Sequence, residues 1–206
     1  MVGLAADAEP VAAVLLAGGA SRRFGERNKL LVEIEGTALL RRIAERILAA
    51  GLTPLVVVTG AEPDETRTVL SGLAVTFVDN PNWAVGMGTS VAAGVAALPA
   101  GVRGAVVVPG DLPNLSVPML QRLADMFVRT GMKRIVVPVT AKGAQRNPVL
   151  WPRSTFEFLS RLSGERGGKT LLDTLGRERL DVVFDDDSLF TDIDTPDDLA
   201  RYLSET

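Results

Sequence analysis

A cluster of positive charge follows two adjacent glycines near the start of the sequence, directly after a short apolar run. Adjacent glycines such as Gly18-Gly19 let the backbone approach an oligophosphate and turn its N–H groups toward it. Arg23 and Lys29 can then add charge from their side chains. The pattern predicts a phosphate-binding loop, and a strand-ending turn beside a solvated basic face is the alternative. The basic residues of the segment are Arg22, Arg23, Arg27 and Lys29.

The glycine spacing of this loop excludes the two commonest nucleotide-binding motifs. A dinucleotide-binding loop needs G-x-G-x-x-G running directly into a helix, whereas the next glycine after Gly19 is Gly25. A P-loop needs G-x-x-x-x-G-K-[ST], and the terminal pair is missing from this loop. The loop therefore belongs to another class of phosphate site.

Asp111 is the first candidate for holding a metal ion. It comes shortly after the apolar run Ala105–Val108, between Gly110 and Pro113. A carboxylate at the carboxyl end of a parallel strand points into the ligand crevice, where it can hold Mg²⁺ against phosphate oxygens. A turn-forming aspartate is the alternative.

A second glycine-rich segment, Gly86-Met-Gly, comes directly before Thr89, Ser90 and an alanine-rich stretch. We expect Val91–Leu98 to be helical. A glycine-rich entry to a helix N-terminus offers free N–H groups to a phosphate or a base. Simple N-capping by Thr89 or Ser90 is the alternative.

The composition limits which chemistry is available. The 206 residues include no histidine and no cysteine, which removes the commonest general base, the commonest zinc ligand and any thiolate nucleophile. Catalysis must use carboxylates, lysine, arginine, hydroxyls and a hard cation. The net charge of −3 argues against general binding to nucleic acid, for which a basic surface is expected.

The first ten residues have no basic region and are followed by an apolar run too short to span a membrane. We expect residues 1–10 to form a flexible tail on a cytoplasmic protein. Residues 11–206 are expected to form one domain, because this length allows a full hydrophobic core without disulfides. No contact with a membrane is expected.

Short valine-rich runs alternate with helical patterns along the chain, as in a buried parallel sheet covered by helices. This alternation predicts a mostly parallel sheet in a three-layer α/β/α arrangement, with ligands at the carboxyl ends of the strands. The polar stretches 140–150 and 163–170 are expected to be the longest loops. The expected strands are Val11–Leu16, Leu55–Val58, Val75–Val78, Ala105–Val108, Ile135–Val139 and Leu180–Phe184.

Three helices carry start signals in the sequence. Thr37 is expected to cap a helix that Gly51 ends. Ser116 is expected to cap a second, long helix. Thr195 before Pro196 predicts the cap and first residue of the last helix.

Five segments of the chain together resemble one enzyme family. The basic loop resembles the L-A-[AG]-G-x-S-x-R-[MF]-G-x(2,3)-[DN]-K signature of nucleotidyltransferases, most closely the branch that attaches a nucleotide to molybdopterin. The other four segments occur in family order. They are Asn80–Ser90, similar to N-P-x-[WY]-x-x-G-M-x-x-S; Val108–Pro113, similar to x-x-x-D-x-P; Gly164–Lys169, similar to G-D-x-G-[AG]-R; and Asp192–Pro196, similar to D-I-D-T-P.

The resemblance implies a Rossmann-like nucleotidyltransferase fold of the nucleotide-diphospho-sugar transferase type, and it assigns roles to single residues. It makes Arg23 and Lys29 catalytic, and it places Asp194 with Asp111 at a Mg²⁺ ion. Capping of the last helix by Asp192 and Asp194 is the alternative. The implied nucleotide-binding residues are Leu16, Ala17, Gly18, Gly19, Thr59, Asn80, Gly86 and Ser90.

The implied reaction moves a nucleoside monophosphate from an NTP to the phosphate of molybdopterin, releasing pyrophosphate and leaving a dinucleotide cofactor for a molybdoenzyme client. CTP is the preferred donor, because Asn28-Lys29 and the segments at Gly86 and Gly164 resemble the cytidylyl branch. GTP is the alternative, because Gly18 resembles the guanylyl branch. Transfer to a sugar or alditol phosphate and a non-catalytic molybdenum cofactor chaperone are the other functions left open.

The sequence departs from the family in the segments expected to bind the acceptor. The cytidylyl branch usually has Gly-His-Pro where this chain has Arg146-Asn147-Pro148. Glu165 and Lys169 replace the usual aspartate and arginine of the later loop. Lysine cannot offer the bidentate fork of arginine, so the acceptor side is where this chain differs from the family pattern.

Overall fold

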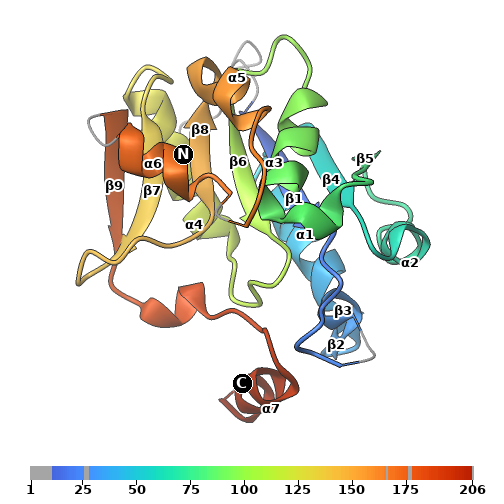
Figure 1. Cartoon of the computed structure of the whole chain (residues 1–206). Coiled ribbons are helices and arrows are strands. Elements are labelled where there is room, and N and C mark those ends of the chain that lie inside the picture. The colour runs from blue at the N-terminus through green and yellow to red at the C-terminus, as the bar shows by residue number, and fades with distance from the viewer. Residues whose placement is uncertain (1–10, 26–27, 166, 176–177, 206) are drawn as a thin grey trace.

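A seven-stranded sheet forms the middle layer of the structure (Figure 1). In this computed structural model the described residues are 11–25, 28–165, 167–175 and 178–205, so the expected tail over 1–10 and Arg27 of the basic loop lie outside them. The strand order is β5-β4-β1-β6-β8-β7-β9. The strands are β1 (Val11–Ala17), β4 (Leu55–Thr59), β5 (Val75–Asp79), β6 (Gly104–Pro109), β7 (Ile135–Thr140), β8 (Val149–Pro152) and β9 (Arg179–Phe184).

The six predicted strands are confirmed, and β8 is the strand of the seven-stranded sheet that the sequence pattern does not predict. Val149 and Leu150 lie in this strand, inside the stretch 140–150 that is expected to be a loop. A run of four residues is too short to show a strand period. Strand β8 is antiparallel to both neighbours, β6 and β7, while the other paired strands of the seven-stranded sheet are parallel. Its first residue therefore lies at the edge where the parallel strands end.

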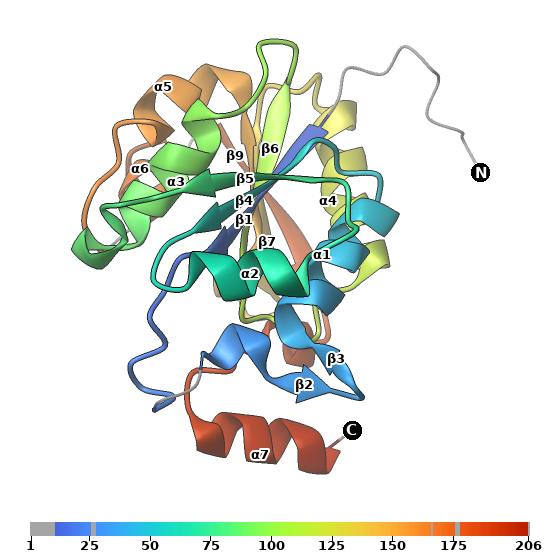
Figure 2. The same ribbon diagram turned by 90° about the vertical axis from the view of Figure 1, so that its right-hand side faces the viewer.

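Alternate residues of the strands pack against helices on opposite faces of the sheet. In β1, Ala13 and Leu15 join the core beneath α1 and α4, whereas Ala12 and Val14 join the core beneath α3, α5 and α6. Figure 2 shows these two layers on either side of the sheet. The three-layer α/β/α arrangement is confirmed. The helices are α1 (Leu39–Ala49), α2 (Pro63–Val69), α3 (Met87–Ala96), α4 (Val117–Arg129), α5 (Phe156–Leu159), α6 (Lys169–Thr174) and α7 (Pro196–Glu205).

Of the five residues that are expected to begin or end a helix, four are confirmed. The Ser116 side chain accepts a hydrogen bond from the Met119 N–H at the start of α4. Gly51 follows the last turn of α1 with a φ of +78°, which suits a residue without a side chain. Thr195 and Pro196 begin α7. The expectation for Thr37 is wrong, because Thr37 pairs with Ile34 in the small hairpin β2 (Glu33–Ile34) and β3 (Thr37–Ala38).

The connections at the carboxyl ends of the strands place the predicted chemistry together. β1 ends at the glycine pair of the basic loop, and β6 ends just before Asp111. The backbone after β9 returns to the same edge, where the Ile193 N–H donates to the Asp111 carbonyl at 3.1 Å. Within the described residues, no helix is long and apolar enough to cross a membrane.

Candidate active site

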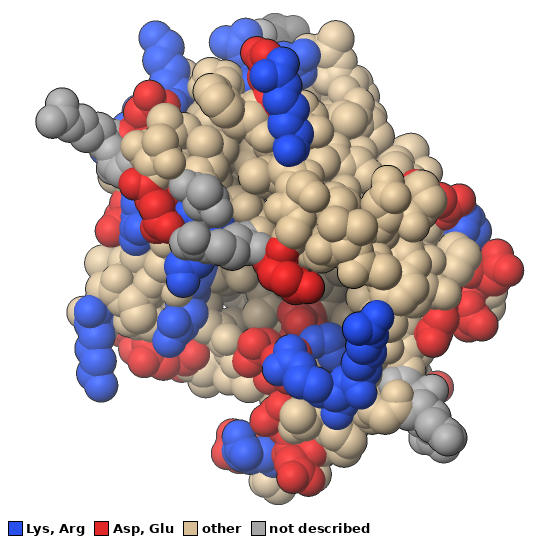
Figure 3. Space-filling view, in the orientation of Figure 1, with Lys and Arg blue, Asp and Glu red and all other residues tan. Residues whose placement is uncertain are grey.

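A cavity of about 880 Å³ opens at the carboxyl ends of the strands. Its wall includes the glycine pair and cations of the basic loop on one side. The residues before β8 and those around the start of α6 form the other side. In Figure 3, acidic and basic side chains gather next to each other around the hollow in the middle of this face. The size and the mixed charge suit a nucleotide-sized anion with a cation.

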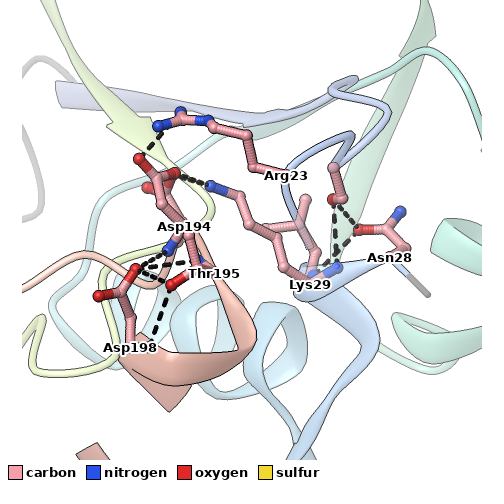
Figure 4. A network of polar contacts seen from close by, with 9 residues as sticks. Arg23, Asn28, Lys29, Asp194, Thr195 and Asp198 are labelled. Carbon is pink, nitrogen blue, oxygen red and sulfur yellow. Dashed lines mark hydrogen bonds and ion pairs between the residues drawn. The ribbon is translucent and has the colours of Figure 1, made fainter. Parts of the chain in front are cut away.

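Lys29 joins the two predicted metal ligands. Its Nζ lies 2.7 Å from Asp111 Oδ2 and 2.6 Å from Asp194 Oδ1. Arg23 Nη2 lies 2.9 Å from the other oxygen of Asp194. Figure 4 shows both cationic side chains directed at Asp194. All four predicted catalytic and metal-binding residues therefore meet at one place, although Lys29 and Asp194 are 165 positions apart.

The neighbouring carboxylates change the pKa of Lys29. The Lys29 side chain is 14% exposed. Burial is the largest influence on its pKa and would lower it, but the charges and hydrogen bonds of Asp111 and Asp194 together outweigh burial and raise the pKa above its usual value. Lys29 is therefore a fixed positive charge. Burial also raises the pKa of the nearby Asp192 carboxyl, and the charges of Asp111 and Asp194 raise it further.

The start of α7 decides between the two interpretations of Asp194. Asp198 Oδ2 accepts hydrogen bonds from the backbone N–H groups of Asp194 and Thr195 at 3.2 and 2.9 Å. Thr195 Oγ1 in turn accepts from the Asp198 N–H at 3.2 Å. Thr195 and Asp198 thus cap the helix reciprocally. The Asp194 carboxylate is left to pair with the two cations, and the alternative of capping by Asp194 is not supported.

Two predicted phosphate-loop glycines lie at the cavity wall, and their surroundings differ. A Cβ added to Gly18 would lie 3.3 Å from the Thr59 carbonyl oxygen and 3.4 Å from Ser90 Oγ. Nothing lies within 4 Å of a Cβ added to Gly19. Leu16, just before the glycines, also lines the cavity. Gly18 is thus enclosed by neighbouring elements, whereas Gly19 faces open space.

The other implied nucleotide-binding residues divide into two groups. Gly86 and Ser90 line the cavity with the residues above. The structure does not bring Ala17, Thr59 or Asn80 to it: Ala17 packs in the core beneath α1. Thr59 is fully buried, and its hydroxyl donates to the Asp79 carboxylate.

Asn80 supports the cavity wall from behind. Its Nδ2 donates to Thr89 Oγ1 at 2.9 Å and to Ser90 Oγ at 3.0 Å, and its Oδ1 accepts from the Asn82 N–H at 3.0 Å. The side chain is 4% exposed. Asn80 therefore holds the start of α3 against the end of β5.

The expectation of free N–H groups at the start of α3 is wrong for most of them. The Gly88 N–H donates to the Gly164 carbonyl at 2.9 Å, and the Gly86 N–H donates to the Trp83 carbonyl at 3.2 Å. A Cβ on Gly86 would lie 2.4 Å from the carbonyl carbon of Gly164, and one on Gly88 would lie 2.8 Å from Ser163. These glycines therefore let the 163–165 backbone pack against the helix. N-capping by Thr89 is also not seen, because its hydroxyl donates to the carbonyls of Asn82 and Gly86.

Some residues that line or support the cavity are missing from the predicted site. Ser21 and Asn28 hold the basic loop in shape, since Ser21 Oγ donates to Asn28 Oδ1 at 3.1 Å and accepts from the Lys29 N–H at 3.1 Å. Both belong to the loop signature, which is the signal that identifies them. Others, such as Gln145 and Phe190, reach the cavity through long-range folding, and no spacing in the sequence indicates them.

The donor set fits one kind of metal ion. Asp111 and Asp194 direct one oxygen each at the same cationic atom, Lys29 Nζ. Mg²⁺ and Mn²⁺ prefer such oxygen ligands, and Mg²⁺ is often held by one or two carboxylates together with substrate phosphates. Among the described residues, no group of three or more acidic side chains is arranged to hold a metal alone. The two carboxylates therefore suit a cation that arrives with phosphate.

Comparisons with known proteins show the family of this chain. Residues 13–180 match the family described as a MobA-like NTP transferase domain. A probable molybdenum cofactor guanylyltransferase of Natronomonas pharaonis is 28% identical over 196 residues, which are 91% of this chain and 94% of the relative. Nicotine blue oxidoreductase of Paenarthrobacter nicotinovorans is 36% identical over 118 residues, and the chain spans only 57% of that protein.

The solved structure of Rv0371c from Mycobacterium tuberculosis H37Rv has the same fold. It is 26% identical in sequence, superposes with a TM-score of 0.82, and the match covers 96% of this chain and 99% of that one. The same protein has also been solved as a complex with manganese. Because the family match covers most of the sequence and the fold match nearly all of it, the chain belongs to the MobA-like NTP transferases, a family of nucleotidyltransferases.

Proposed function

We propose that the protein transfers a nucleoside monophosphate from CTP or GTP to the phosphate of a molybdopterin-type acceptor and releases pyrophosphate. The observation that carries the proposal is the meeting of Lys29, Arg23, Asp111 and Asp194 in the cavity. The molybdenum cofactor guanylyltransferase among the relatives supports the acceptor class. The reaction belongs in the cytoplasm, where NTPs are available, and its product would be handed to a molybdoenzyme client.

The chemistry needs charge neutralisation and alignment more than proton transfer. An oxygen of the acceptor phosphate attacks the α-phosphorus, and the bond from that phosphorus to the bridging oxygen breaks, leaving the electron pair on pyrophosphate. The attacking oxygen is already ionised, so no general base is required, which suits a chain without histidine. Lys29 and Arg23 are placed to neutralise the charge that builds on the phosphates.

Asp111 and Asp194 are the residues that would hold a divalent cation. When bound, such a cation neutralises phosphate oxygens as a Lewis acid. We propose Mg²⁺ for this role, and the manganese complex of Rv0371c supports a divalent cation in this fold. Arg23, with 73% of its side chain exposed, is free to follow the phosphates, whereas the buried Lys29 is fixed in place.

The donor base is the finer part of the proposal. CTP is our preferred donor because of the cytidylyl-like segments at Asn28, Gly86 and Gly164. GTP is favoured by the name of the Natronomonas relative and by Gly18, whose missing side chain leaves room beside Ser90. The two donors differ mainly in the size of the base, so the space around Gly18 is where the choice can be tested.

Pyrophosphate release is the direct test of the proposed reaction. We expect release from CTP, and a smaller release from GTP, when molybdopterin and Mg²⁺ are both present. Release with a sugar or alditol phosphate in place of molybdopterin would show the alternative transferase. Binding of molybdopterin without any release from the four NTPs would show the non-catalytic chaperone and contradict the proposal.

Substitution Lys29→Ala is expected to lower kcat by about 10²- to 10³-fold, the typical effect of losing one preorganised charge at a reacting centre. Steady-state kinetics would measure it. Lys133→Ala is the matched control, because Lys133 is exposed on the turn before β7, away from the cavity. A near-normal kcat for the Lys29 variant would separate this residue from the reacting phosphates.

Substitution Asp111→Asn is expected to remove most Mg²⁺-dependent activity while nucleotide binding without metal persists. A neutral amide oxygen is a weaker ligand for a hard cation than a carboxylate. A Mg²⁺ titration of activity, with nucleotide binding followed by tryptophan fluorescence, would measure both effects. The exposed Asp125→Asn on α4 is the control. An unchanged Mg²⁺ titration would move the metal site away from Asp111.

Substitution Gly18→Ala is expected to shift donor preference further toward CTP. The added methyl would lie 3.3 Å from the Thr59 carbonyl oxygen and 3.4 Å from Ser90 Oγ, so it is expected to displace Ser90, which lines the cavity, and reduce the space there. A purine should lose more from that reduced space than a pyrimidine, by roughly 1–3 kcal/mol. Competition between CTP and GTP, with kcat/KM for each, measures the shift. A wild-type preference for GTP above about tenfold would overturn the choice of CTP and leave the transfer chemistry in place.

A further inference from the structure

The turn between β4 and α2, residues 60–62, contacts both ends of the basic loop. At the first end, the Ala61 N–H donates to the Gly18 carbonyl at 3.2 Å. A Cβ on Gly60 would lie 2.3 Å from that same carbonyl oxygen, so only glycine allows this approach. The turn therefore packs directly on the backbone where the phosphate-binding loop begins.

At the second end, the contact is made by the Glu62 side chain. Glu62 Oε2 accepts a hydrogen bond from Asn28 Nδ2 at 2.9 Å. Asn28 is 6% exposed, and its Oδ1 accepts from Ser21 Oγ at 3.1 Å and from the Leu30 N–H at 3.0 Å. Ser21 Oγ accepts from the Lys29 N–H at 3.1 Å. A continuous set of hydrogen bonds thus runs from Glu62 to the backbone of Lys29.

Glu62 is itself held in place by α2. Its backbone carbonyl accepts from both the N–H and the Oγ1 of Thr66, at 3.3 and 2.9 Å. Although Glu62 stands at the N-cap position of α2, its side chain makes no capping hydrogen bond there. Its carboxylate is directed at Asn28 instead. A helix that carries none of the cavity residues is in this way connected to the loop that does.

We infer that Glu62 is a positioning residue for the phosphate-binding loop and Lys29, and that Asn28 and Glu62 form a matched pair. Asparagine can donate to a carboxylate through Nδ2 and accept through Oδ1, and both capacities are used here. An aspartate at position 28 could still accept the hydrogen bond from Ser21, but it could not donate one to Glu62. The two carboxylates would then face each other without a hydrogen bond. The loop signature allows either residue at this position, and Glu62 requires the amide.

The pair can be tested by reversing the direction of its hydrogen bond. Asn28→Asp is expected to lower kcat/KM for the nucleotide by roughly 10- to 100-fold, the factor that matches loss of a hydrogen bond to a charged group. Glu62→Gln keeps an acceptor for Asn28 and should stay within about threefold of wild type. In the double variant, the new amide can donate to the new carboxylate, so activity should return to the level of Glu62→Gln. Asp64→Asn, which removes an exposed acidic charge two residues away on α2, is the matched control.

The kinetic readout rests on the proposed function, so a second readout is needed that does not. The rate of tryptic cleavage after Arg22 and Arg23 reports how firmly the loop is held in the protein alone. We expect faster cleavage for Asn28→Asp and a return toward the wild-type rate in the double variant. If wild-type protein transfers no nucleotide, the proposed function fails and these cleavage rates still decide the inference. Cleavage in Asn28→Asp at the wild-type rate, or no recovery in the double variant, would overturn it.

Discussion

The Lys29 ammonium is the interaction on which the rest of the site depends. A buried cation needs partners, because losing water without compensation disfavours its charge. Lys29 finds them in Asp111, 82 positions later, and Asp194, 165 positions later. Its hydrogen bonds therefore join the loop after β1, the loop after β6 and the segment before α7. Removing the ammonium would leave two carboxylates facing each other, and removing either carboxylate would leave the ammonium half paired.

This pairing also explains how the same residues can serve both the free and the loaded protein. Without substrate, the carboxylates neutralise Lys29 and Arg23. In the proposed reaction, an NTP that arrives with a divalent cation would bring charges of both signs. Its phosphates would replace the carboxylates as partners of Lys29, and the cation would replace Lys29 as partner of the carboxylates. Lys29, Asp111 and Asp194 would thus each have a partner of opposite charge both before and after the substrate binds. This matters because a buried charge without a partner is strongly destabilising.

The part of the fold that is predictable from the sequence is the part governed by local pattern. Valine-rich runs identify six strands because buried parallel strands need apolar side chains on both faces. Asp111 is identified because it closely follows a strand, and Lys29 because it belongs to the basic loop that follows the glycine pair. Strand β8 escapes prediction because it is short and its neighbours are distant in sequence. Thr59 and Asn80 also escape correct placement, since spacing gives no information about whether a polar side chain turns toward the cavity or toward Asp79 and Ser90.

Because β8 is antiparallel to its neighbours, the two sides of the cavity are formed by different kinds of connection. One side is formed by connections after the parallel strands and includes the basic loop that carries the family signature. The other side follows from β8, whose antiparallel course brings Arg146 and Asn147 to the same edge, opposite the basic loop. Glu165 and Lys169 line the cavity there as well. The four residues that depart from the family pattern therefore all lie on this second side of the cavity, and the basic loop is not part of that side. A nucleotide brings the same triphosphate whatever its base, so in the proposed reaction the acceptor would bind on this second side, where the chain differs from the family pattern.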